Sequence, residues 1–318
     1  MHVIKYSPPL DGLRAICILF TLFNHIAGVP AFIQGTVGVD VFFPLSGFLI
    51  TGILLSNNWN DLRGYYIRRL FRIAPVYYLA LAATLILALV THRLALGESK
   101  LDQIQMMLVQ SVLFSRELSD APTLFGQAWT VGIEEKFYLA WPVLFLLLKK
   151  DRARLVFLGV LLIALALIAK RDFLRGYGGI AFGCTASILY FRHGLFIRTS
   201  YALVLAVAAY VACYYTQWNL LIALASALLI PSLYATESAA SRFLSHKTMV
   251  FLGRLTFSLY MFHVMVFAFA KLALKRLGAD DWYFVFMAGY SASVLTAWLV
   301  YRFFESPLIA RGKRLARA

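Results

Sequence analysis

The sequence predicts an all-α integral membrane protein with about ten transmembrane helices and short amphipathic helices at the membrane interface. Two features of the composition predict this class: 61% of the 318 residues are hydrophobic and only 14% are charged, whereas a soluble domain is about 45–50% apolar and about 25% charged. The third is the recurrence of apolar stretches of about 20 residues, the length that crosses a bilayer as a helix. No hydrophilic stretch is long enough for a soluble domain, so residues 1–318 are expected to form a single membrane domain with no appended soluble domain.

The expected transmembrane helices are the ten apolar windows of the chain. They lie at residues 10–30, 36–56, 74–90, 128–148, 154–170, 177–192, 200–216, 218–236, 249–270 and 283–304. Residues 61–73 mix arginine with Tyr, Phe and Ile, which is typical of a basic amphipathic helix lying on the cytoplasmic surface. Residues 101–114 have helical apolar spacing and are expected to lie on the outer surface.

The charge balance is strongly basic, with 30 Lys and Arg against 15 Asp and Glu. In a soluble protein this excess would suggest nucleic-acid binding, but in a membrane protein it is explained by basic cytoplasmic loops, so no nucleic-acid partner is expected. With both termini in the cytoplasm, the inner loops hold about 17 basic residues and the outer loops about nine. The basic outer loop 170–176 runs against this bias.

The three cysteines, Cys17, Cys184 and Cys213, all lie in apolar runs without metal-ligand spacing. Cysteines in such positions pack as small apolar side chains. Neither a disulfide framework nor a metal site is therefore expected.

The first expected span carries three ionisable residues in the segment LDGLRAICILFTLFNH. Arg14 and His25 are eleven positions apart, which places them on one helical face roughly 16 Å apart, and Asp11 joins that face one turn earlier. Ionisable side chains inside a membrane are costly, so they mark candidate functional sites. The alternative is that Asp11 and Arg14 are interfacial charges and that His25 only packs.

Two further spans carry ionisable residues at a similar expected depth. The span at 128–148 contains Glu134 and Glu135, whose side chains should point about 100° apart, so that one faces a site and the other pairs with Lys136 or an arginine. The span at 249–270 contains His263, which could alternatively be a packing histidine bonded to a carbonyl. His25, a glutamate of the pair and His263 are thus expected in one layer nearer the outer face.

Polar residues also mark the second span and the basic amphipathic segment. Asp40 lies near the outer end of the second span, and Ser46 follows Pro44 in its middle, where Pro and Gly allow close backbone approach. No nucleophile elbow surrounds Ser46, so it is interpreted as a packing or substrate contact. The amphipathic segment contains Arg68, Arg69 and Arg72, whose planar guanidinium groups can bind phosphate through paired N–H donors. These arginines predict a site for a phosphorylated cytoplasmic cofactor, with lipid headgroup binding as the alternative. Nucleotide-binding and metal-protease motifs do not occur.

These segments, in this order, resemble acyltransferase family three, the membrane-bound acyltransferases that O-acylate cell-surface sugars. The resemblance covers almost the whole chain and rests on LDGLRAICILFTLFNH, GVDVFFPLSGFLITGILL, RRLFRIAPVYY, WTVGIEEKFYLAWP, LGRLTFSLYMFH and FFESP. Three patterns are jointly specific for this family. They are an arginine followed after ten residues by a histidine in the first motif, the R-x-x-R pair, and the W-x-x-x-x-E-E motif. The departures are small: Gly132 stands where the family often has Ser, Lys136 where it often has Gln, and Phe262 where Trp is common.

The resemblance implies the site residues and their roles. His25 matches the essential histidine, Arg14 its partner, and Glu134 and Glu135 the acidic pair, which together form the expected catalytic set. Arg69 and Arg72 match the R-x-x-R pair and, with Arg68, are expected to bind acetyl-CoA. The remaining residues of these motifs are assigned to the acceptor substrate: Asp11, Asp40, Ser46, Trp129, Tyr138, Tyr260 and His263.

The implied reaction moves an acetyl group from cytoplasmic acetyl-CoA to a hydroxyl of a cell-surface polysaccharide, oligosaccharide or lipid-linked sugar, in a bacterial inner (cytoplasmic) membrane. Neutral imidazole suits a general base near pH 7, so His25 is assigned this role. Direct attack is favoured, and an acyl-histidine intermediate stays open, as do the acceptor's identity and a homo-oligomeric state. The rival hypotheses are a transporter or flippase for an anionic or lipid-linked solute, and a non-enzymatic membrane assembly or sensor protein.

Overall fold

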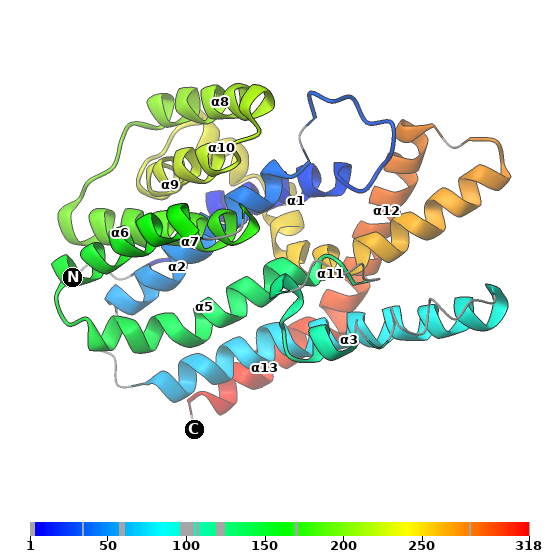
Figure 1. Ribbon diagram of the computed structural model, residues 1–318, viewed down its shortest axis with the longest axis horizontal. Coiled ribbons are helices and arrows are strands. Elements are labelled where there is room, and N and C mark those ends of the chain that lie inside the picture. Colours follow the sequence, from blue (N-terminus) through cyan, green and yellow to red (C-terminus); the bar gives the residue numbers. More distant parts are fainter. Residues whose placement is uncertain are drawn as a thin grey trace. The chain divides into compact units, whose positions relative to one another are not determined.

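The computed structural model describes residues 4–33, 35–56, 61–95, 105, 108–118, 125–168, 171–279 and 281–317. All regular structure in these ranges is helical, and none of their residues forms a strand. The all-α prediction is therefore confirmed for the described chain (Figure 1). The helices divide between two compact units, unit 1 with residues 1–60 and 136–256, and unit 2 with residues 61–135 and 257–318.

Unit 1 is built from seven complete helices among its described residues. They are α1 (Pro8–Phe23), α2 (Val37–Ser56), α6 (Asp151–Ile168), α7 (Arg171–His193), α8 (Thr199–Thr216), α9 (Leu220–Ala235) and α10 (Ala239–Leu244). Two long helices contribute residues to both units. They are α5 (Ala128–Leu147) and α11 (Lys247–Arg276).

Helices α2 and α7 pack along each other at glycine contacts. A Cβ atom on Gly47 would collide with the carbonyl oxygen of Ile180, and one on Gly183 would collide with the carbonyl oxygen of Pro44. Small residues allow this approach of two backbones, which is how helices commonly associate in membranes. The close approach expected around Pro44 and Gly47 is therefore confirmed, and any larger side chain would force the two helices apart.

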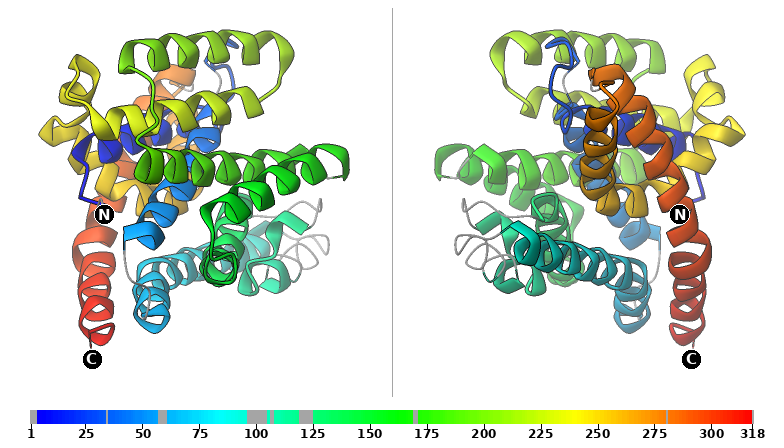
Figure 2. Two further views of the ribbon diagram at one scale, coloured as in Figure 1. Left: turned by 90° about the vertical axis from the view of Figure 1, so that its left-hand side faces the viewer. Right: turned by 90° about the vertical axis from the view of Figure 1, so that its right-hand side faces the viewer.

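Helices α8 and α9 form an antiparallel hairpin (Figures 1 and 2). Gln217 ends α8 in the left-handed conformation, at φ 58°, and its backbone N–H donates to the Cys213 carbonyl. This turn reverses the chain after α8, because a left-handed residue ends a helix and leaves its last carbonyls hydrogen-bonded. The Thr199 hydroxyl contacts those of Ser232, at 2.9 Å, and Thr236, at 2.7 Å, and so ties the other end of the hairpin.

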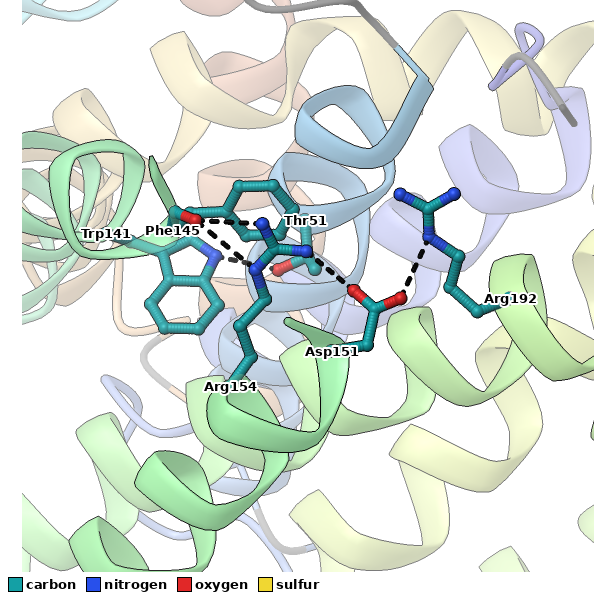
Figure 3. A network of polar contacts seen from close by, with 6 residues as sticks. All are labelled: Thr51, Trp141, Phe145, Asp151, Arg154 and Arg192. Atoms are coloured by element: carbon teal, nitrogen blue, oxygen red, sulfur yellow. Dashed lines mark hydrogen bonds and ion pairs between the residues drawn. The ribbon is translucent and has the colours of Figure 1, made fainter. Parts of the chain in front are cut away.

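A buried arginine joins α5, α6 and α7 (Figure 3). Arg154 of α6 donates from Nε and Nη2 to the Phe145 carbonyl, at 3.2 and 2.9 Å, and its guanidinium lies 3.5 Å from the Phe145 ring centroid. The third side of the guanidinium bonds Asp151 at 2.6 Å, and Asp151 also pairs with Arg192 of α7 at 3.2 Å. Arg154 thus caps the last turn of α5, where the carbonyls would otherwise lack donors.

Unit 2 has three further helices and two short turns among its described residues. They are α3 (Leu62–Ala95), the short η1 (Arg116–Leu118), α12 (Trp282–Val300), the π-helical turn η2 (Tyr301–Glu305) and α13 (Ser306–Leu315). Helix α13 packs on α3 (Figure 1). A Cβ atom on Gly312 would lie 2.5 Å from that of Phe71, so glycine brings α13 close to the segment that carries Arg69 and Arg72.

Five helical segments are long and apolar enough to cross a membrane. They are Val37–Ser56, Leu62–Val90, Thr199–Thr216, Lys247–Arg276 and Trp282–Leu315. The other five expected spans are also helical, as α1, α5, α6, α7 and α9, but α1 and α9 have only 16 residues each. The helices therefore indicate a multi-pass membrane protein, and the number ten stays a prediction.

The structure differs from the sequence-based expectations in three places. Helix α1 ends at Phe23 rather than near residue 30. The amphipathic segment 61–73 and the following span form one continuous helix, α3, with Pro75 inside it. Arg175 lies within α7 and not in a loop, so the basic loop 170–176 that opposed the charge bias is shorter than expected.

Of the stretch 101–114, only residue 105 and residues 108–114 are described, with helix at 105 and 108–112.

Candidate active site

Asp11 and Arg14 form a bonded pair at the start of α1. Arg14 Nη1 donates to Asp11 Oδ1 at 2.8 Å, and the Tyr6 hydroxyl donates to Asp11 Oδ2 at 2.8 Å. Arg254 of α11 adds a bond from Nη2 to the Tyr6 hydroxyl, at 3.2 Å. The expectation that Asp11 and Arg14 share one helical face is confirmed. The contributions of Tyr6 and Arg254 had no signal in the sequence pattern.

His25 lies just beyond α1 and is exposed. The chain tightens after Phe23 into a turn in which the backbone N–H of His25 donates to the Leu22 carbonyl at 3.2 Å. The position of His25 deep within a continuous helix was therefore predicted wrongly.

Asp40 lies at the centre of a buried network in unit 1. Its side chain is 1% exposed. Arg175 Nε donates to Asp40 Oδ1 at 2.9 Å, Arg175 Nη2 lies 2.9 Å from the same oxygen, and Asn219 Nδ2 donates to Oδ2 at 2.7 Å. Both carboxylate oxygens are thus occupied by groups from α7 and from the residue preceding α9, an arrangement that stabilises the packing of α2.

Two residues assigned to the acceptor contact each other in unit 1. The Tyr138 hydroxyl of α5 donates to Ser46 Oγ of α2 at 3.1 Å. One turn further along α5, Trp141 Nε1 donates to Thr51 Oγ1 at 2.9 Å (Figure 3). These bonds cross-link α5 and α2, so Ser46 and Tyr138 have a structural role whether or not they also contact substrate.

The three arginines of α3 have different surroundings. Arg68 is exposed and pairs loosely with Asp61, at 3.4 Å. Arg69 and Arg72 are half-buried, and each lies within the electrostatic reach of a carboxylate of unit 2, Arg69 with Glu135 and Arg72 with Glu305. The R-x-x-R pair therefore differs from Arg68 in being half-buried and in having carboxylates distant in the sequence as its acidic neighbours.

Glu305 was not assigned to the site from the sequence, although it belongs to the late FFESP segment. It lies in η2, is 1% exposed, and accepts a 2.5 Å hydrogen bond from the Ser258 hydroxyl of α11. A buried carboxylate needs donors and a positive partner, and Ser258 and Arg72 supply these. Glu305 thus links α11 and η2 to the basic face of α3.

The acidic pair of α5 lies in unit 2. Glu135 is within the electrostatic reach of Arg69 of α3, and the expected divergence of Glu134 and Glu135 stays a prediction. Glu135 Oε1 is buried and accepts no hydrogen bond from any residue that the structure describes. Only glycine fits at the neighbouring position 132, because a Cβ atom on Gly132 would collide with the Glu117 carboxylate of η1. The absence of a serine at 132 thus leaves room for Glu117.

A polar cluster joins the start of α5 to the middle of α11. The Tyr260 hydroxyl donates to the backbone carbonyl of Gln127 at 3.0 Å and contacts Thr130 Oγ1 at 2.8 Å. Gln127 Nε2 donates to the Met261 carbonyl at 3.0 Å, and His263 Nδ1 lies 2.7 Å from the Tyr260 carbonyl. Tyr260 and His263, both assigned to the acceptor, are therefore brought together with Gln127, which the sequence reasoning missed. Trp129, also assigned to the acceptor, lies on α5 next to this cluster in the chain and is half-buried.

The expected site residues divide between the two units. Those in unit 1 are Asp11, Arg14, His25, Asp40, Ser46 and Tyr138, and those in unit 2 are Arg68, Arg69, Arg72, Trp129, Glu134, Glu135, Tyr260 and His263. The common layer of His25, a glutamate and His263 therefore stays a prediction. Among the described residues, no group of three or more His, Cys, Asp and Glu side chains could hold a metal ion.

Comparisons with known proteins give a consistent answer. A family model described as an acyltransferase domain matches residues 8–302. The protein named "Putative peptidoglycan O-acetyltransferase YrhL" of Bacillus subtilis is 26% identical over 357 aligned residues, covering 98% of this chain and 56% of the relative. The peptidoglycan O-acetyltransferase OatA of Listeria monocytogenes is 25% identical over 354 residues, covering 97% and 56%. No solved structure matches the chain.

The chain thus spans little more than half the length of these two relatives. The family match includes every residue that the sequence assigned to the site, from Asp11 to His263. With the helical membrane architecture and the resemblance of its motifs, this match shows that the chain belongs to acyltransferase family three.

Proposed function

We propose that this chain is a membrane O-acetyltransferase that moves an acetyl group from cytoplasmic acetyl-CoA to a hydroxyl of a cell-surface polysaccharide, oligosaccharide or lipid-linked sugar. The observation that carries the proposal is the alignment of 97–98% of the chain with relatives named as O-acetyltransferases. Because both relatives are named for peptidoglycan, its glycan is the first acceptor to test, ahead of an exopolysaccharide.

The R-x-x-R pair supports an acyl-CoA donor. Coenzyme A is polyanionic and cannot cross a bilayer, so its phosphates need a basic site on the side from which it comes. A guanidinium carries five N–H donors in a planar fork, which allows Arg69 and Arg72 to bind phosphate while they keep their carboxylate partners. Glu135 and Glu305 would then fix where the two forks point, and exposed Arg68 would add attraction at longer range.

The chemistry needs a base for the acceptor alcohol, and His25 fits this role. Its neutral imidazole takes the proton while the acceptor oxygen attacks the thioester carbonyl carbon. The carbon–sulfur bond then breaks, and the imidazolium returns the proton to the leaving CoA thiolate. Arg14, held by Asp11, would add positive charge on the helix that precedes His25. The alternative route passes through an acyl-histidine.

The proposal is tested by the products formed by the purified full chain. With acetyl-labelled acetyl-CoA and muramidase-released peptidoglycan fragments, we expect equal amounts of free CoA thiol and of label in the glycan. A transporter or flippase instead moves its solute across a proteoliposome membrane without consuming acetyl-CoA. The proposal would be contradicted if thiol release were no greater than in a protein-free control, both with peptidoglycan and with crude surface glycan.

A further inference from the structure

A buried acceptor atom in unit 2 points to a binding site for one hydroxyl of the glycan. Gln127 immediately precedes α5 and is 6% exposed. Its Nε2 donates to the Met261 carbonyl of α11 at 3.0 Å. Its Oε1 is buried and accepts no hydrogen bond from the part of the chain that the structure describes.

The orientation of the Gln127 amide is fixed by its neighbour. A backbone carbonyl only accepts hydrogen bonds, so reversing the amide would place Oε1 against the Met261 oxygen and would lose the bond. The amide nitrogen must therefore face Met261, and Oε1 must face away from it. A buried oxygen in this position is stabilised when a bound molecule donates a hydrogen bond to it.

The surrounding cluster holds this amide in place. The Tyr260 hydroxyl bonds the backbone carbonyl of Gln127 and contacts Thr130, so the residues that flank the start of α5 are attached to α11 at two points. These bonds hold the backbone from which the Gln127 side chain projects, and the bond to Met261 holds the side-chain amide itself, as a binding site requires. Gln127 thus belongs to a built polar site and is not a surface residue that happens to be covered.

His263 offers a second acceptor in the same cluster. Its Nδ1 lies 2.7 Å from the Tyr260 carbonyl, which can only accept, so Nδ1 carries the proton. In the neutral ring, Nε2 is then an acceptor. A ligand of Gln127 Oε1 must bring a hydrogen-bond donor, which a polyhydroxylated sugar does.

The position along α5 favours the glycan over the donor. Gln127 precedes Glu135 by eight residues, or roughly 12 Å along the helix axis, and Glu135 marks the level of Arg69. The phosphates of the proposed donor belong at the arginine level. A group two turns of α5 away from it, beside Tyr260 and His263, is better placed for the acceptor.

We infer that Gln127 Oε1 accepts a hydrogen bond from a hydroxyl of the acceptor glycan, within a polar site completed by Thr130, Tyr260 and His263. The inference rests on the proposed function and adds an acceptor-binding residue to it. The pantetheine arm of the donor, which carries amide N–H groups, is the other source of such a donor.

The test compares two buried glutamines. Gln127→Met keeps the length of the side chain but removes Oε1. Gln110→Met is the matched control, because Gln110 is also 6% exposed, lies in the same unit and also has a buried Oε1 that accepts no hydrogen bond from the described residues. The cluster of Tyr260 and Met261 is bonded to Gln127, so the comparison tests whether this cluster makes the site. With peptidoglycan fragments as acceptor, we expect Gln127→Met to raise the acceptor KM about tenfold, the usual effect of one lost hydrogen bond. The KM for acetyl-CoA should stay within about twofold, and Gln110→Met should change neither.

A conservative variant and the wild type separate the outcomes. Gln127→Glu, when protonated, keeps both the donor to Met261 and the free acceptor, so its acceptor KM should return toward the wild-type value below the pKa of that carboxyl. An unchanged acceptor KM in Gln127→Met would overturn the inference, as would a rise confined to the KM for acetyl-CoA, which would assign the atom to the donor. Absence of any acetyl transfer by the wild type would instead overturn the proposed function.

Discussion

The two units of the chain satisfy their buried charges in different ways. In unit 1, both Asp40 oxygens are bonded to Arg175 and Asn219, and Arg154 is bonded on all sides by Phe145 and Asp151. In unit 2, Glu135 and Glu305 act on Arg69 and Arg72 through charge, and buried oxygens of Gln127 and Glu135 accept no bond from the described residues.

This difference separates charges that stabilise packing from charges that can bind a substrate. A charge whose partners are all protein groups has little capacity left for a ligand, and removing one partner strongly destabilises the fold. A guanidinium has five N–H donors, so we expect Arg69 and Arg72 to bind phosphate in addition to their protein partners. We therefore expect the proposed chemistry of unit 1 to depend chiefly on exposed His25, and the proposed binding groups to lie in unit 2.

The largest effect is expected at the buried pair of unit 1. Arg175→Ala leaves the Asp40 carboxylate without its positive partner, so the free energy of unfolding should fall by about 3–5 kcal/mol. Equilibrium unfolding of the protein in detergent measures this loss. Arg198→Ala, at an exposed arginine, is the control and should change stability by less than about 0.5 kcal/mol. A similarly small loss for Arg175→Ala would mean that Asp40 is free to serve the acceptor.

A tenfold effect is expected at the arginine pair of unit 2. Arg72→Ala should raise the KM for acetyl-CoA about tenfold, because one charge-assisted contact to phosphate is lost. It should also lower stability, since Glu305 loses its positive partner. Adding Glu305→Gln should recover the stability and leave the KM raised. Recovery of both quantities in the double variant would show that Arg72 is only structural.

A smaller effect is expected at the cap of α5. Arg154→Lys keeps the charge near Asp151 but loses the planar fork that bonds the Phe145 carbonyl and stacks on its ring. We expect a loss of about 1–2 kcal/mol of stability, with both KM values unchanged. A change in the KM for acetyl-CoA would place this network in the donor site, against the distinction between the units.

Local sequence patterns predicted much of the helical structure. Each of the ten apolar windows contains a helix among its described residues, and the spacing of Asp11 and Arg14 correctly placed them on one face. The pattern could not show where α1 ends, because the apolar run continues past Phe23 while the chain turns. Nor could it show that the amphipathic segment and the next span form one helix, α3, since nothing in the sequence window marks their continuity.

Partners distant in sequence were not predictable. Arg175 bonds to Asp40, which is 135 positions away in the sequence. The charge pattern predicted Arg175 in a loop, because such patterns carry no information on which helices pack together. Glu305 stood in a recognised motif but without an assigned partner, since only the fold brings Ser258 and Arg72 to it. In the sequence, Gln127 is an ordinary polar residue before a helix. Only the structure shows that its Oε1 is buried and accepts no hydrogen bond from the described residues.

The account is tested most directly by acetyl transfer in His25→Ala. His25 is exposed in the turn after α1, so its removal leaves no cavity and the variant should unfold at the same denaturant concentration as the wild type. With labelled acetyl-CoA and peptidoglycan fragments, we expect the rate of label transfer to fall at least about 100-fold, the contribution of a general base. A folded His25→Ala protein that transfers acetyl at the wild-type rate would contradict the account.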